Sequence, residues 1–124
     1  MVRVEREKHA SGPLVQAIGS RGFTVDGGIY PGLLLTPLRA DDWRPPALAE
    51  LTFEHLRPLL ALEPAPEFIL LGTGASMAFA PPALVAVLEA QGIGLEAMDS
   101  RAAARVWGLL RSEGRWIAAA IMPI

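Results

Sequence analysis

Two short loops of the sequence carry the residues best suited to bind a ligand. One loop, residues 72–77, follows the apolar run 68–71, and the other, residues 99–101, follows the predicted strand 93–98. Glycine lets the backbone approach a ligand closely, whereas hydroxyl and guanidinium groups donate hydrogen bonds to anions. The candidate residues for binding a small anion are therefore Gly72, Thr73, Gly74, Asp99, Ser100, Arg101 and, one helical turn further on, Arg105.

Simpler structural roles compete with this interpretation. Glycines after a strand often form a tight turn, Asp99 or Ser100 can cap a helix, and arginines on an exposed helix face are often solvated. The first loop also lacks the complete motifs of two known kinds of site. Met77 stands where a dinucleotide-binding loop needs its third glycine, and Ala78 stands where a nucleophile elbow needs its closing glycine. The sequence therefore contains no recognisable catalytic set.

Composition limits the classes of protein that need to be considered. The 124 residues fit one domain, and 52% of them are apolar, which is enough to build a core. The 11 basic and 13 acidic residues leave a net charge of −2, so we expect no nucleic-acid partner. Because the sequence has no cysteine and only 2 histidines, we expect neither a metal site nor a cofactor.

The distribution of apolar residues bears on location and domain organisation. Residues 1–10 are too polar for a secretory signal, and no apolar stretch is long enough to span a membrane. We therefore expect a cytoplasmic protein without membrane insertion. In it, residues 1–12 form a flexible segment and residues 13–124 form a single α/β domain.

Short apolar runs separated by glycine predict strands in the amino-terminal half, at residues 14–18, 23–25 and 29–35. The Asp26-Gly27 pair favours a tight turn, so the last two runs should form a β-hairpin, with Pro31 and Gly32 marking an edge or a bulge. Residues 37–46 are expected to form a loop that Trp43 anchors to the core. A short helix beginning after Thr52 should end or kink at Pro58.

The carboxyl-terminal half has the order β-α-β-α-β. Strands are expected at 68–71, 93–98 and 116–122, with helices from Pro81 to Gly92 and from Asp99 or Ser100 to Gly114. Parallel strands joined by right-handed crossovers would then place both ligand loops at one edge of a sheet. The predicted fold class is α/β: a compact single domain with a mixed sheet, a C-terminal β-α-β-α-β unit and an N-terminal β-hairpin region.

The helix over residues 82–91 has almost no polar face, since Glu89 is nearly its only polar residue. Such a helix needs cover on more than one side. One hypothesis is an exposed apolar patch that binds a protein partner or a second copy in a homodimer; its candidate interface residues are Val85, Leu88, Trp107 and Arg111. The other is that the amino-terminal strands cover this helix within the fold.

The motifs of the sequence also resemble those of a known family. They occur in the following order: Leu71-Gly72-Thr73-Gly74, Pro81-Pro82, residues 92–100, residues 102–105 and Glu113-Gly114-Arg115. This series resembles a bacterial and mitochondrial domain family of unknown biochemical function, whose mitochondrial members are assembly factors for respiratory complex I, the NADH dehydrogenase. The chain departs from the family pattern at Val106-Trp107-Gly108, where relatives commonly have Thr-Tyr-Asn, and at Leu95-Glu96-Ala97, where relatives have a valine-rich strand.

The resemblance implies a compact α/β domain with a mixed sheet and without established catalytic residues. The leading hypothesis is a non-enzymatic accessory or assembly-type protein that acts by binding another protein. The alternative is a small anion- or nucleotide-binding domain, with or without enzymatic activity, whose site lies at the Gly72-Thr73-Gly74 loop.

Overall fold

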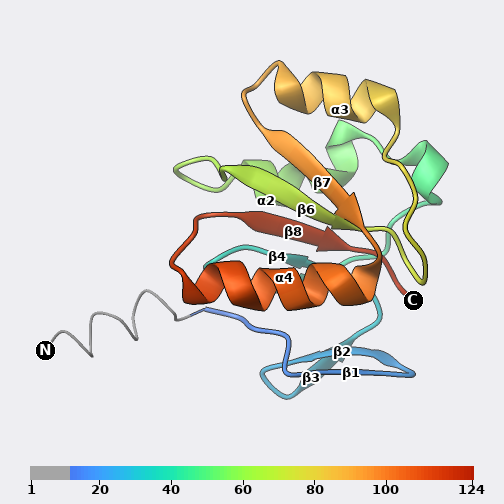
Figure 1. Cartoon of the computed structure of the whole chain (residues 1–124), viewed down its shortest axis with the longest axis vertical. Coiled ribbons are helices and arrows are strands. Elements are labelled where there is room, and N and C mark those ends of the chain that lie inside the picture. The colour runs from blue at the N-terminus through green and yellow to red at the C-terminus, as the bar shows by residue number, and fades with distance from the viewer. Residues whose placement is uncertain (1–11) are drawn as a thin grey trace, which may run out of the picture.

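The computed structural model describes residues 12–124, which form two β-sheets and helices on both sides of the larger sheet (Figure 1). The smaller sheet is antiparallel and contains β1 (Ala17–Gly19), β2 (Gly22–Val25) and β3 (Gly28–Tyr30). The larger sheet has the order β5-β4-β8-β6-β7 and contains β4 (Leu33–Leu35), β5 (Ala40–Asp42), β6 (Phe68–Gly72), β7 (Gly94–Met98) and β8 (Ala118–Ile121). The helices are the 3₁₀ turns η1 (Leu48–Glu50) and η2 (Phe53–Leu56), and the α-helices α2 (Arg57–Leu60), α3 (Pro82–Glu89) and α4 (Ser100–Ser112).

The expected β-α-β-α-β unit is confirmed. Strand β6 pairs in parallel with both β7 and β8, whereas β4 pairs antiparallel with β8, so the sheet is mixed. Pro81 and Pro82 begin α3, where missing N–H groups cost nothing, and Gly92, with a φ of 77°, lies just beyond its end. Asp99 caps α4, and Gly114, with a φ of 75°, follows its end.

Side chains along the central strands point alternately to the two faces of the large sheet, and each face carries its own hydrophobic core. Ile69 and Leu71 of β6 point to one face of the large sheet, where they pack with Leu84 and Leu88 of α3. Leu70, between them, points to the opposite face. There the second core includes Phe23 of β2 and the α4 residues Ala103, Ala104 and Trp107. Figure 1 shows this layering, with α4 in front of the sheet and α2 behind it.

The amino-terminal half differs from the prediction at Pro31 and Gly32. The hairpin at Asp26-Gly27 is confirmed, with φ values of 51° and 84°. The single strand expected over residues 29–35 is wrong, because β3 belongs to the small sheet and β4 to the large one. Pro31 has no N–H to donate, and a side chain at Gly32 would place its Cβ 2.8 Å from the carbonyl oxygen of Trp43. The chain therefore crosses between the two sheets at this point.

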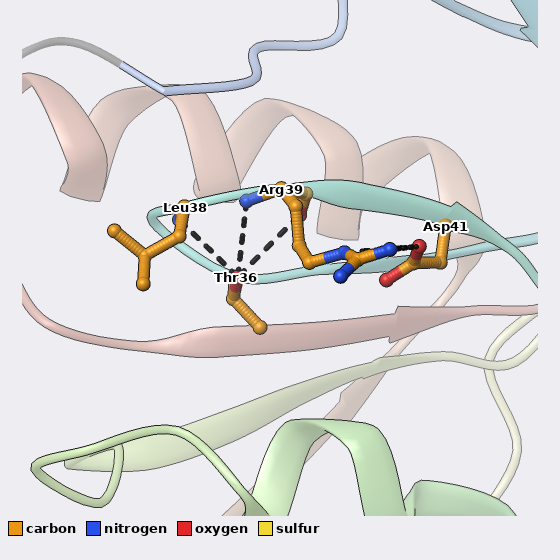
Figure 2. Close-up of polar contacts among 4 residues, drawn as sticks. All are labelled: Thr36, Leu38, Arg39 and Asp41. Carbon is orange, nitrogen blue, oxygen red and sulfur yellow. Dashed lines mark hydrogen bonds and ion pairs between the residues drawn. The ribbon is translucent and has the colours of Figure 1, made fainter.

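The segment predicted as a loop over residues 37–46 contains the edge strand β5. A side-chain turn precedes it: the hydroxyl of Thr36 accepts hydrogen bonds from the N–H groups of Leu38 and Arg39, both at 3.2 Å (Figure 2). Arg39 then pairs with Asp41 at 2.7 Å. Because residues at this edge are charged, the sequence lacks the apolar pattern that predicts a strand. The same charges disfavour pairing of this edge with strands of other chains. The expected anchoring role of Trp43 is confirmed, since it is buried and its Nε1 donates to the carbonyl oxygen of His55 at 3.1 Å.

The predicted flexible segment 1–12 lies, except for Gly12, outside the described residues. Among residues 12–124, no helix is both long and apolar enough to cross a membrane.

Candidate functional site

The two predicted loops meet at the carboxyl edge of β6 and β7. Gly72 lies opposite Met98 in the parallel register, so the residues that follow them are neighbours. The N–H of Thr73 donates to the carbonyl oxygen of Met98, and the N–H of Ser100 donates to that of Gly74, both at 2.8 Å. The sequence prediction that these loops share one edge is therefore confirmed.

Ser100 ties this edge together from inside the fold. Its side chain is completely buried, its Oγ accepts from the N–H of Gly74 at 2.8 Å, and it donates to the carbonyl oxygen of Met122 at 2.7 Å. A Cβ at Gly72 would lie 2.8 Å from this Oγ and 2.9 Å from the Cα of Ser100. The hydroxyl and the missing side chain thus serve close packing of β6, α4 and the segment after β8.

The side chain of Thr73 forms hydrogen bonds with the backbone of the loop that follows it. Its Oγ1 donates to the carbonyl oxygen of Ser76 at 2.7 Å and accepts from the N–H of Ala78 at 3.1 Å. The same oxygen lies 3.1 Å from the carbonyl oxygen of Met98. One side chain therefore fixes the backbone on both sides of Met77.

The remaining candidate residues do not converge on a cavity with Thr73. Asp99 caps α4, because its Oδ1 accepts from the N–H of Ala102 at 2.9 Å. Arg101 and Arg105 are both exposed on α4. Arg101 lines a surface cavity of about 140 Å³. Thr73, Asp99 and Arg105 line neither this cavity nor three others found among the described residues. The side chains of Thr73 and Asp99 both bond to backbone groups of the fold.

The loop that Thr73 fixes presents two large apolar side chains to solvent. Met77 is 51% exposed and Phe79 is 85% exposed. Beside them is an open groove of about 520 Å³, lined by Leu48, Ala49, Phe79, Ala80, Pro81 and Pro82. We call Met77 together with these six residues the Phe79 surface. Sequence reasoning missed it; the available signal was an aromatic residue between the end of a strand and the prolines that begin the next helix.

Two of the predicted interface residues, Trp107 and Arg111, lie inside the fold. Trp107 is completely buried, its Nε1 donates to the carbonyl oxygen of Pro13 at 2.9 Å, and it packs in the core that β2 closes. Arg111 is also buried, and its guanidinium donates to the carbonyl oxygen of Arg115 at 2.7 Å. Burial lowers the pKa of Arg111 from its usual value. Trp107 therefore connects α4 to the segment before β1, and Arg111 connects it to the segment before β8.

The helix α3 packs with one side against the large sheet. Its residue Leu88 is completely buried against the large sheet, so it cannot serve as an exposed interface residue, whereas Val85 is half-buried and Val87 is 43% exposed. The small sheet of β1, β2 and β3 does not cover α3, because it packs in the core on the opposite face of the large sheet. Part of α3 therefore stays exposed, with Val87 on it, and the first residue of the helix, Pro82, belongs to the Phe79 surface.

A family model and a bacterial relative both match nearly the whole chain. Residues 15–122 match a family described as a protein of unknown function, DUF498/DUF598. A Rhodobacter capsulatus protein, itself uncharacterised, is 34% identical over 96% of this chain and 92% of its own length. The chain belongs to the DUF498/DUF598 family. This membership confirms the resemblance that the motifs indicate.

Other relatives of this DUF498/DUF598 protein have a functional name or a solved structure. A zebrafish (Danio rerio) protein named NADH dehydrogenase [ubiquinone] 1 alpha subcomplex assembly factor 3 is 27% identical over 98% of this chain and 71% of its own length. A crystal structure from Bordetella parapertussis is 32% identical, with a TM-score of 0.81 over 92% of this chain and 98% of that one. The fold class expected from the sequence is thereby confirmed.

Proposed function

We propose that this protein is a non-enzymatic assembly-type factor that holds a protein subunit on the Phe79 surface. The observation that carries the proposal is the 85% exposure of Phe79 beside an apolar groove. Aromatic side chains are enriched at the centre of protein interfaces, where a few residues provide most of the binding energy. Full burial of a phenylalanine is worth about 1.5–3 kcal/mol, so covering Phe79 would contribute about 2 kcal/mol.

The hydrogen bonds of Thr73 favour this role because they prepare the loop for binding. A loop already held in its bound conformation loses less conformational freedom when a partner arrives. Thr73 fixes the carbonyl of Ser76 and the N–H of Ala78, so Met77 and Phe79 project from a backbone that is restrained near both. The groove beside Phe79 can accept an apolar side chain of the partner.

The names of relatives support a specific client. The zebrafish relative is named as an assembly factor for NADH dehydrogenase, and an assembly factor must bind subunits that are not yet in place. We propose that the client of the present chain is a subunit of the same dehydrogenase. The apolar Phe79 surface would cover a patch of that subunit until its final neighbour replaces the factor.

The test is a replacement of Phe79 in cells that lack the chromosomal gene. Phe79→Ser should reduce the amount of assembled NADH dehydrogenase on native gels, whereas the wild-type chain should restore it. The matched control is Leu109→Ser, which changes a 60% exposed side chain on α4 that is not part of the Phe79 surface. It should restore assembly fully. Both variants should keep the wild-type circular dichroism and melting temperature, because both side chains are exposed.

A photo-cross-linking residue at position 79 should then capture a dehydrogenase subunit, and one at position 109 should not. Restoration of assembly by Phe79→Ser to the wild-type level would contradict the proposal. A cross-link from position 79 to a second copy of the chain, with a doubled mass in light scattering, would replace the subunit by a homodimer as occupant of this surface.

A further inference from the structure

A second cavity, of about 140 Å³, lies between the small sheet and the first turn of α4. It is lined by Gly19, Ser20, Arg21, Gly22, Pro31, Arg101, Pro123 and Ile124, and we call it the Arg21–Arg101 cavity. Arg21 lies in the two-residue turn between β1 and β2, where Gly19 pairs with Gly22. Arg101 is the second residue of α4. Two arginines from distant parts of the sequence thus border one small space.

These two arginines differ from four other described arginines in their partners. Ion pairs hold Arg39, Arg44, Arg57 and Arg115 to carboxylates. Within residues 12–124, no ion pair links Arg21 or Arg101 to an acidic side chain. Asp99, the nearest acidic residue along the chain to Arg101, uses its Oδ1 to cap Ala102. Among the described residues, neither Arg21 nor Arg101 is therefore held by an ion pair with an acidic side chain.

The position of Arg101 is also electrostatically unfavourable without an anion. The amino-terminal end of a helix carries a partial positive charge, so a cation in the first turn of α4 is repelled by the helix dipole. Arg21 adds a second positive charge at the same cavity. An anion between the two guanidinium groups would offset the repulsion between the arginines and the repulsion of Arg101 by the helix dipole. Each guanidinium and the helix terminus would attract the anion.

We propose that the Arg21–Arg101 cavity binds a phosphate group. Guanidinium groups match the oxygen geometry of phosphate and donate charge-assisted hydrogen bonds to it. The volume of about 140 Å³ equals roughly four to five water molecules at about 30 Å³ each, which is room for a phosphate group and little else. A whole nucleotide does not fit, since cavities for such ligands are typically about 300–1,000 Å³. The phosphate is therefore either the free ion or the terminal group of a molecule that extends into solvent.

This site is independent of the proposed client-binding function. None of its residues belongs to the Phe79 surface. It also differs from the anion site expected from the sequence, because of the seven residues expected there only Arg101 lines the cavity.

The experiment is an NMR titration of the full chain with inorganic phosphate, with sodium chloride used to keep the ionic strength constant. Wild type should show saturable shifts at Gly19, Arg21, Gly22 and Arg101, with a Kd of about 1 mM. Arg21→Gln and Arg101→Gln should each weaken binding about tenfold or more, because each removes a charged donor. The matched control is Arg105→Gln, one turn further along α4 and outside the cavity, which should leave the Kd unchanged.

A parallel titration with glycerol phosphate distinguishes the two sources of the phosphate group. Tighter binding of the ester would identify a phosphorylated molecule as ligand, and tighter binding of the free ion would identify inorganic phosphate. Shifts that do not saturate above about 10 mM phosphate would overturn the proposal. So would an equal loss of affinity in Arg105→Gln, because it would show a general charge effect.

Discussion

Removal of the hydroxyl of Ser100 should destabilise the whole domain. Ser100→Ala leaves the N–H of Gly74 without its acceptor at 2.8 Å and the carbonyl oxygen of Met122 without its donor at 2.7 Å. Ser100 is completely buried, and the space left by one oxygen atom is too small to admit a replacement water. A buried polar group without a partner costs about 1–3 kcal/mol. At about 1–1.5 kcal/mol for each group, in the lower part of that range, the two groups together should cost about 2–3 kcal/mol.

The loss is large enough to measure and small enough to leave the protein folded. Domains of this kind have free energies of unfolding of about 5–15 kcal/mol. For a chain of 124 residues, 1 kcal/mol corresponds to roughly 4 °C, so the melting temperature should fall by about 8–12 °C. The assay is equilibrium urea unfolding followed by circular dichroism, together with a thermal melt.

Ser112→Ala is the matched control for this measurement. The hydroxyl of Ser112 also donates to a backbone carbonyl, that of Leu109 at 2.6 Å, but it does so at an exposed position of the same helix. Water can replace that bond, so the control should change stability by less than about 0.5 kcal/mol. If Ser100→Ala were as mild as Ser112→Ala, the account of a buried bridge between β6, α4 and the segment after β8 would be refuted.

Two further changes test the packing and the charges around this fold. Gly72→Ala should cost about 1–3 kcal/mol in urea unfolding, since its Cβ would lie 2.9 Å from the Cα of Ser100; unchanged stability would show that the edge is loosely packed. A hydrogen bond from Arg115, and then one from the N–H of Trp116, hold the pKa of Glu67 below its usual value. The resulting stability is present above the unfolded-state pKa of about 4.3 and is lost as the pH falls through the lower folded-state pKa. Glu67→Gln should therefore melt below wild type at pH 7 and together with it in strong acid; a constant difference at all pH values would contradict this assignment.

The sequence predicted the elements whose cause is local. Asp26-Gly27 determines the hairpin of β2 and β3 through its backbone conformation. Asp99 begins α4 by accepting a hydrogen bond from the N–H of Ala102, three residues ahead. The run 68–71 is apolar because β6 is buried on both faces, and this property is visible without a structure. Parallel pairing of β6 with β7 then follows from the order of the elements.

The errors arose where distant residues decide the outcome. The change of sheet at Gly32 depends on the carbonyl oxygen of Trp43, which no pattern within residues 29–35 reveals. Trp107 looks like an interface anchor beside polar neighbours on a helix, but β2 covers it through residues more than 80 positions away along the chain. Helical periodicity identifies an apolar face and does not identify the element that covers it.

The same limit explains why the Gly72-Thr73-Gly74 loop resembles a ligand site. Glycines, hydroxyls and a helix cap at the carboxyl edge of a parallel sheet are the parts from which α/β proteins build binding loops. Whether such parts face a ligand depends on where the hydroxyl groups find their partners. Here Ser100 binds Gly74 and Met122, and Thr73 binds the loop that carries Phe79. The hydroxyl groups of Ser100 and Thr73 are thus used within the chain, whereas the side chains that the loop exposes include the apolar Met77 and Phe79.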